Sequence, residues 1–529
     1  MIEQTFAVAL AAVAGFAALA HGAHDLWAAT VVHLAAVFLA AAWVARGALV
    51  REASVSTRFA PPVLLIVGAF WLSWRGSVNP GESLLALKDW GAALLLLLLA
   101  AEVLRKDENA DMFLKASAPV LWLELGVILW QRDDRVYEAL PRLTSASRWF
   151  WFNLSEQVPG TILNANATAA FLLAWVGVLA GRLNEDRTRG LRLSPVLLSS
   201  LAAATLGLLL LNCLWAFACL LAGLAVLTRS RRAGWGAAGI ILALAAWKFG
   251  HRLDWTGAVE PQREALRRLD WWRAGLRMWT EHPWFGIGLG NFPSAYPAFA
   301  GEGPAGVVRH TRFAHGALAT LAAETGAAGL AALGAVGAWL ARSSRGKTRR
   351  APYTAGLAML ALCLSIEIGV EFPGILVTAA IFAGAALAPA AGERFRPRGS
   401  IALVAGAAAL ALTPWLASPF FAGRLTVEGE WFLSQGALSE AIGKFSTAAG
   451  LDPLAFEPER GLARAYASRF KRERRPEDWE SARNAQRRAL ALNRLDLRLR
   501  RELLEYEALG PLPPRGARPS SPRRSRPPK

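Results

Sequence analysis

The amino-acid sequence predicts an all-α, polytopic membrane protein with about 12–13 transmembrane helices and a small C-terminal domain of helical repeats. Three observations predict this class. The 529-residue chain is 54% hydrophobic and only 19% charged, which is less charge than a soluble domain carries. Apolar runs of about 17–22 residues recur between positions 4 and 417, and runs of that length cross a bilayer. Because a backbone exposed to lipid must satisfy its own hydrogen bonds, these runs should be helices.

Thirteen apolar runs are long enough to be spans, and they define a transmembrane domain over residues 1–417. The runs lie at residues 4–20, 26–45, 60–74, 84–104, 113–130, 167–181, 195–211, 213–228, 233–249, 316–340, 353–370, 375–390 and 400–417. The first run lacks the charged leader and the cleavage signal of a secretory peptide, so we expect it to be retained as a helix.

Basic residues in the short connectors orient these spans. Arginines follow every even-numbered span, as at Arg46, Arg105 and Arg394, and cytoplasmic loops carry such residues. The N-terminus should therefore be cytoplasmic, and everything after the thirteenth span should be external. The two long external connectors are residues 131–166 and 250–315. Because much of the net charge of +18 lies in connectors between apolar runs, it does not indicate nucleic-acid binding.

Beyond the last span, residues 422–509 are charged and helical in pattern. Small and aromatic residues, including Gly429, Ala441 and Phe445, fall where a tetratricopeptide repeat places its packing residues. Two such repeats would offer a surface for an acceptor or a protein partner, and a plain helical pair is the alternative. The tail 511–529 consists mainly of Pro, Arg and Ser, a composition typical of disorder.

Candidate functional residues lie at the outer ends of spans and in the long connectors. Asn164 and Asn166 precede or begin the sixth span. They predict either a helix cap or amides that face a ligand. Gly286 and Gly288 belong to the run His282–Asn291, in which alternate glycines let a backbone approach an anion closely.

Arginine and histidine mark the second long connector. His315 stands at the mouth of the tenth span, three residues after Arg312. Arg268 and Arg273 belong to a basic group further upstream. Arginine binds phosphate through two parallel hydrogen bonds, so a lipid diphosphate is a natural anionic partner. A solvated helix face would have the same composition.

The sequence contains no Walker loop, no zinc signature and no Gly-x-Ser-x-Gly elbow. The three cysteines, Cys213, Cys219 and Cys363, lie in apolar segments without metal-ligand spacing. We therefore expect neither a metal nor another cofactor.

The motifs between Arg268 and Gly329 resemble those of the O-antigen ligase and polymerase family. The family pattern is an Arg followed by a Trp, then His-Pro-x-x-Gly-x-Gly-x-Gly-Asn-Phe, then His-Asn-x-x-Leu-x-x-x-x-Glu-x-Gly-x-x-Gly. This chain has similar stretches at His282–Phe292 and His315–Gly329. The stretch Gly160–Asn166 is also similar to a family motif, and the resemblance covers the first twelve spans in order.

This resemblance implies a metal-independent glycosyltransferase of a bacterial inner membrane. It would take a glycan from undecaprenyl diphosphate on the periplasmic face and transfer it to a lipid, glycan or protein acceptor, as in lipopolysaccharide synthesis. By the same analogy, Arg268 would hold the diphosphate, with Arg273 as the alternative. His315 would be the catalytic residue that activates the acceptor hydroxyl or stabilises the departing diphosphate. The other candidates for substrate binding are Asn164, Asn166, Gly286, Gly288 and Arg312.

Three positions depart from the family pattern. Gly316 replaces the asparagine after the histidine, and Ala165 replaces a proline between two asparagines. Where many members have Ser-Arg-Gly before the eighth span, this chain has Leu214-Trp215-Ala216. The loss of that arginine removes a phosphate contact, so either another arginine replaces it or catalysis is altered or lost.

Two other functions compete with glycan transfer. A non-catalytic scaffold would keep the fold and use residues 422–509 to recruit partners. A transporter or flippase of lipid-linked glycans would carry ionisable residues near the membrane midplane, and Glu124, Glu367 and Glu371 are candidates. The sequence has no convincing internal repeat of the kind that such transporters often show.

Overall fold

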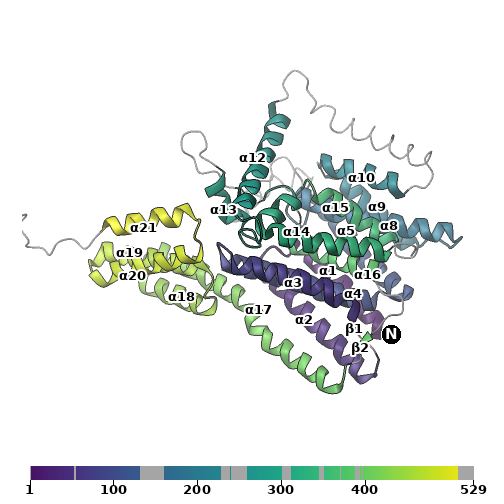
Figure 1. Ribbon diagram of the computed structural model, residues 1–529, viewed down its shortest axis with the longest axis horizontal. Coiled ribbons are helices and arrows are strands. Elements are labelled where there is room, and N and C mark those ends of the chain that lie inside the picture. Colours follow the sequence, from purple (N-terminus) through teal and green to yellow (C-terminus); the bar gives the residue numbers. More distant parts are fainter. Residues whose placement is uncertain are drawn as a thin grey trace, which may run out of the picture. The chain divides into compact units, whose positions relative to one another are not determined.

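A computed structural model describes residues 2–52, 55–131, 160–211, 213–227, 239, 259–300, 311, 313–344, 351–367, 369, 371–387, 394–395 and 397–509. The chain divides into two compact units, Met1–Phe420 and Phe421–Lys529. Each unit has a buried core of its own. Figure 1 shows that nearly all the described elements are helices.

The first unit is built from helices of the membrane-spanning kind. In the described part of the chain, seven helices are long and apolar enough to cross a bilayer, and four shorter apolar helices accompany them. The long helices are α1 (Ile2–Leu19), α2 (Leu26–Leu49), α4 (Pro80–Val103), α5 (Asp107–Gln131), α8 (Ala165–Thr188), α14 (Ala317–Ser344) and α17 (Gly399–Ser434). The shorter ones are α3 (Ala60–Arg75), α9 (Pro195–Leu210), α15 (Ala351–Leu364) and α16 (Pro373–Leu387). The predicted all-α, multi-span class is confirmed.

A few smaller elements complete this unit. They are α10 (Leu214–Leu227), α12 (Val259–Glu281), α13 (Phe292–Phe299), the short turns η1 (His21–Ala23) and η2 (Thr57–Phe59), and the strands β1 (Val55–Ser56) and β2 (Arg394–Phe395). The two strands pair antiparallel. Twelve of the thirteen predicted spans coincide with a helix, and the span at 233–249 lies almost wholly outside the described residues.

One predicted span ends earlier than expected, and this difference shapes the functional site. The apolar run 353–370 is helical only as far as Leu364. The chain then turns before Pro373 opens α16, a first helical position at which proline is tolerated because no intrahelical N–H bond is needed there. Glu367 and Glu371 therefore lie in a connection between two helices.

Helix α8 lies at the centre of the first unit, where most of its residues are buried. It packs against α9 and α15. A Cβ at Gly177 would lie 2.7 Å from the Cα of Gly356, and one at Gly181 would lie 2.8 Å from the Cα of Pro352. Small residues of this kind let helix backbones approach closely. Residue numbers rise along α8 as they fall along α15 in these contacts, so the two helices are antiparallel. The beginning of α8 therefore meets the end of α15.

Contacts near the two ends of α1 show which connectors lie at the same end of the helix bundle. At one end of α1, the hydroxyl of Thr161 donates a hydrogen bond to the Ala18 carbonyl at 3.2 Å. At the other end, Arg46 and Lys106 pair with Glu3 at 2.8 and 2.7 Å. The connectors before α8 and after α2 thus lie at opposite ends of the bundle. This arrangement agrees with the alternation that the basic connectors predict.

The second unit contains the end of α17, followed by α18 (Leu438–Leu451), α19 (Phe456–Glu473), α20 (Pro476–Leu492) and α21 (Leu497–Leu509). Helices α18 to α21 pack in three successive pairs, α18 on α19, α19 on α20 and α20 on α21. The ring of Phe445 is completely buried, and a Cβ at Gly429 or Gly461 would lie 2.7 or 2.4 Å from it. These small residues therefore allow the helices to pack closely, while the assignment to tetratricopeptide repeats stays a prediction.

Candidate functional site

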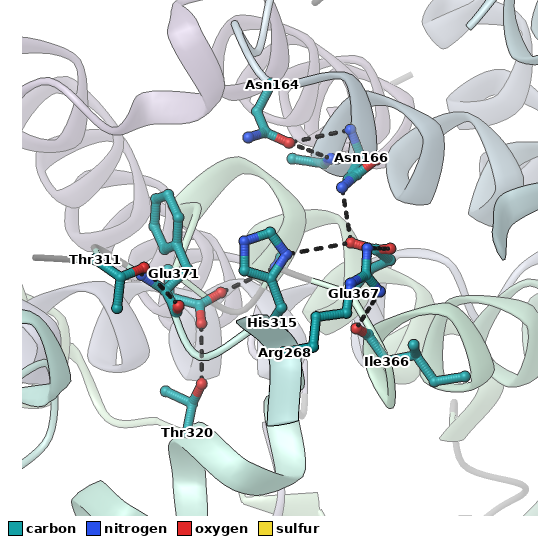
Figure 2. A network of polar contacts seen from close by, with 12 residues as sticks. Asn164, Asn166, Arg268, Thr311, His315, Thr320, Ile366, Glu367 and Glu371 are labelled. Carbon is teal, nitrogen blue, oxygen red and sulfur yellow. Dashed lines mark hydrogen bonds and ion pairs between the residues drawn. The ribbon is translucent and has the colours of Figure 1, made fainter. Parts of the chain in front are cut away.

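The buried carboxylate of Glu367 joins three side chains that the sequence marks as candidates. Its Oε1 accepts a hydrogen bond from Arg268 Nη2 at 2.7 Å, and its Oε2 accepts one from Asn166 Nδ2 at 2.8 Å. The Nδ1 atom of His315 lies 3.6 Å from the same Oε2. Figure 2 shows the carboxylate between these three groups. The Glu367 side chain is 1% exposed and that of His315 is 19% exposed, so the histidine is the more open to a ligand.

Helix packing brings these distant residues together. Asn166 lies in the first turn of α8, and Glu367 follows the end of α15, which meets that turn. Arg268 lies on α12, which packs against α14, and His315 precedes α14. Arg268 Nη1 also donates to the Ile366 carbonyl at 3.4 Å. Four separate segments of the chain therefore converge on one carboxylate.

The two predicted asparagines have different roles in the structure. The Oδ1 atom of Asn164 accepts hydrogen bonds from the N–H groups of Asn166 and Ala167, each at 3.0 Å, and so caps α8. The preceding turn is held by Glu124, which accepts a hydrogen bond from the Thr161 N–H at 2.9 Å. Asn164 thus shapes the start of the helix, while the side chain of Asn166 reaches Glu367.

His315 is held by two tryptophans of α12. The φ angle of His315 is 51°, a left-handed conformation that residues other than glycine rarely adopt outside constrained sites. The Trp272 Nε1–H donates to the His315 carbonyl at 2.9 Å. The Trp271 ring stacks on the imidazole, with ring centroids 4.4 Å apart. A Cβ at Gly316 would lie 3.2 Å from Trp272 Nε1, so the tryptophan occupies the space that a larger residue at 316 would need.

A second carboxylate, Glu371, lies on the other side of His315 (Figure 2). It accepts hydrogen bonds from the Thr320 hydroxyl at 3.2 Å and from the Gly369 N–H at 2.9 Å. Burial raises the pKa of Glu371 above its ordinary value, and these hydrogen bonds and the nearby His315 offset that rise only in part. In the sequence, Glu367 and Glu371 stand out only as ionisable residues near an apolar run. The one signal that could have linked them to the site is that the predicted span order puts these glutamates on the same side of the membrane as His315.

Two of the predicted arginines, Arg273 and Arg312, are not among the described contacts of Glu367. The Arg273 side chain is 69% exposed and pairs with Asp270 at 3.3 Å, so it points away from Glu367. Arg312 lies outside the described residues. The side chains of Leu214 and Trp215, where the family arginine is missing, also lie outside them.

Gly286 and Gly288 belong to a different structure from the one expected. Helix α14 breaks at Gly326, where φ is 62° and ψ is −161°, a conformation that glycine alone adopts readily. The glycine loop enters this break, and the Gly288 N–H donates to the Glu324 carbonyl at 3.0 Å. A Cβ at Gly286 would lie 2.3 Å from the Glu324 backbone. The loop here packs against α14, and the N–H groups of both glycines donate to backbone carbonyls, those of His282 and Glu324, instead of facing a ligand.

The Glu367 cluster combines groups that suit transfer from a diphosphate. The guanidinium of an arginine such as Arg268 can donate two parallel hydrogen bonds to a phosphate. An imidazole such as that of His315 can act as a general base toward a hydroxyl. Among the side chains that the structure describes, no group of three or more His, Cys, Asp or Glu is placed to hold a metal ion.

Comparison with known families matches residues 165–334 to the family described as O-antigen ligase. The matched segment includes Asn166, Arg268 and His315. Glu367 lies beyond it. No curated protein and no solved structure matches the chain.

Proposed function

We propose that this chain, which carries an O-antigen ligase domain over residues 165–334, transfers a glycan from undecaprenyl diphosphate to a lipid, glycan or protein acceptor. The observation that carries the proposal is the cluster in which Glu367 contacts Arg268 and Asn166 and approaches His315. An anion-binding group and a proton acceptor meet there, as a transfer from a diphosphate carrier requires.

In the proposed reaction, His315 takes the proton of the acceptor hydroxyl while the hydroxyl oxygen attacks the anomeric carbon of the donor glycan. The bond between that carbon and the diphosphate oxygen breaks, and undecaprenyl diphosphate leaves with the electron pair. Arg268 binds the diphosphate and stabilises the charge that develops on it. Asn166 lies beside Arg268 on Glu367 and would help to orient the donor.

We place this reaction on the periplasmic face of a bacterial inner membrane. The distribution of arginines in the connectors supports this orientation. Asn166, His315 and Glu367 lie at or next to helix ends that this distribution assigns to the outside. Arg268 lies within α12, in the long connector 250–315 that the same distribution assigns to the outside. The second unit would then also be periplasmic, where its helices would recruit an acceptor or a protein partner.

The contacts of three glutamates support transfer rather than transport. Glu124 holds the turn before α8 through Thr161. Glu367 and Glu371 lie in the connection between α15 and α16, next to His315. These carboxylates thus hold turns and catalytic candidates in place, whereas a transporter would use them along a path through the membrane.

The test compares His315→Ala with His282→Ala, because His282 is an exposed histidine just after α12. Purified proteins in proteoliposomes receive a glycan-loaded undecaprenyl diphosphate and an acceptor, and the released carrier is measured. We expect His315→Ala to lower turnover by about 10²–10⁴-fold, the usual contribution of a positioned base. His282→Ala should keep the turnover of the wild type.

The same variants can be examined in cells. A strain that carries His315→Ala should accumulate carrier-linked glycan while its glycan-bearing acceptor disappears. Full transfer by a correctly inserted His315→Ala protein would contradict the catalytic assignment of His315. A purified wild-type protein that transfers no glycan, in contrast, would favour the non-catalytic scaffold.

A further inference from the structure

The Glu367 carboxylate is paired with the guanidinium of Arg268, the group that a diphosphate would need. The ion pair between Arg268 Nη2 and Glu367 Oε1 is 2.7 Å long, and the two side chains are 10% and 1% exposed. A charge-assisted hydrogen bond at a buried position is strong, because little water screens it. A donor diphosphate therefore has to compete with Glu367 for Arg268.

His315 offers the Glu367 carboxylate a second partner. Within the described part of the chain, the buried Nδ1 atom of His315 makes no hydrogen bond. It lies 3.6 Å from Glu367 Oε2, which is beyond hydrogen-bond length. A shift of the carboxylate by less than about 1 Å would close this gap. Asn166, which donates to the same Oε2, holds the carboxylate close to the imidazole.

We propose that Glu367 is a positioning residue that exchanges partners when the donor binds. The diphosphate takes Arg268, and the released carboxylate accepts a hydrogen bond from the Nδ1–H of His315. This bond leaves Nε2 as the proton acceptor for the acceptor hydroxyl and stabilises the imidazolium that forms. Donor binding thereby prepares the base. The inference rests on the proposed transfer from a diphosphate carrier.

Glu367→Gln tests the exchange because it removes the competing charge and keeps the size of the side chain. Isothermal titration of the detergent-purified protein with farnesyl diphosphate should give an affinity on the order of ten-fold higher than that of the wild type. Turnover with the loaded carrier should fall by about 10²-fold, because His315 loses its partner. A residue with a merely structural role would lower both affinity and turnover.

Glu324→Gln is the matched control. Glu324 is also buried, at 5% exposed, but its carboxylate accepts a hydrogen bond from the Phe292 N–H at 3.0 Å. The affinity of the Glu324→Gln variant for farnesyl diphosphate should equal that of the wild type. If Glu367→Gln does not fold, Glu367→Asp takes its place, because it keeps the charge but draws it back from Arg268. It should shift affinity and turnover in the same directions by smaller factors.

The outcomes separate this inference from the proposed function. Diphosphate binding that is unchanged or weaker in the folded Glu367 variants would overturn the exchange and leave the proposed transfer standing. A wild-type protein that binds no farnesyl diphosphate and transfers no glycan would overturn the proposed function, and the exchange with it.

Discussion

At the scale of single residues, the site depends on which arginine of α12 faces inward. Arg268 and Arg273 are five residues apart on this helix, so at about 3.6 residues per turn they point in different directions. Arg268 is 8% exposed and bonds to Glu367. Arg273 is exposed and pairs only with a neighbour on its own helix among the described residues. Two arginines of similar sequence context therefore have different electrostatic surroundings.

This difference predicts unequal effects of two matched substitutions. Arg268→Ala should weaken the binding of farnesyl diphosphate by about 1.5–3 kcal/mol, the range for hydrogen bonds to charged groups. Arg273→Ala should leave binding within about 0–1 kcal/mol of the wild type, because an exposed ion pair contributes little. Titration calorimetry measures both, with thermal unfolding as the check on folding. A larger loss for Arg273→Ala would show that the helix face assigned to the site is the wrong one.

At the scale of secondary-structure elements, the break in α14 links the glycine loop to the helix that follows His315. The Ile287 and Gly288 N–H groups donate to the carbonyls of Ala323 and Glu324 at 2.9 and 3.0 Å. These bonds join the loop to the helix at the break. Because His315 directly precedes α14, the loop stabilises the element that carries the catalytic candidate.

The break makes Gly326 sensitive to any side chain. A Cβ at Gly326 would lie 2.5 Å from the Trp284 carbonyl carbon, and φ there is 62°. Gly326→Ala should therefore cost at least about 1–3 kcal/mol from backbone strain and should lower the thermal unfolding temperature. Gly334→Ala is the control on the same helix, because nothing lies within 4 Å of a Cβ there. We expect the unfolding temperature of Gly334→Ala to be unchanged or raised, because alanine in a helix reduces the entropy of the unfolded chain. Equal unfolding temperatures for the two variants would contradict the break.

At the scale of the whole molecule, the basic connectors predict which end of the helix bundle is periplasmic. Alkaline phosphatase is active only outside the cytoplasm, so fusions after Ala300 and Leu509 should both be active. A fusion after Arg189, in the basic connector that follows α8, should be inactive. An active fusion at Arg189, or an inactive one at Leu509 beside an active one at Ala300, would overturn the proposed orientation.

Hydropathy and residue type along the chain are enough to predict the membrane class, nearly all the spans and the main candidate residues. Hydropathy and run length are local properties, and a lipid environment allows few backbone solutions. The class therefore follows from composition along the chain. Asn166 and His315 also stand out locally, because polar groups at the ends of apolar runs are conspicuous, and Arg268 stands out as part of a basic group in a long connector.

How these residues are combined depends on helix packing, which the sequence pattern does not report. Glu367 lies about 200 residues from Asn166 in sequence, and their contact depends on the close crossing of α8 and α15 at Gly177 and Gly356. No spacing rule reports such a crossing. The alternate glycines predict a backbone that something can approach closely, but their pattern does not say what approaches. In the structure the approaching group is α14 itself, since the break at Gly326 exposes backbone groups that the glycine loop satisfies.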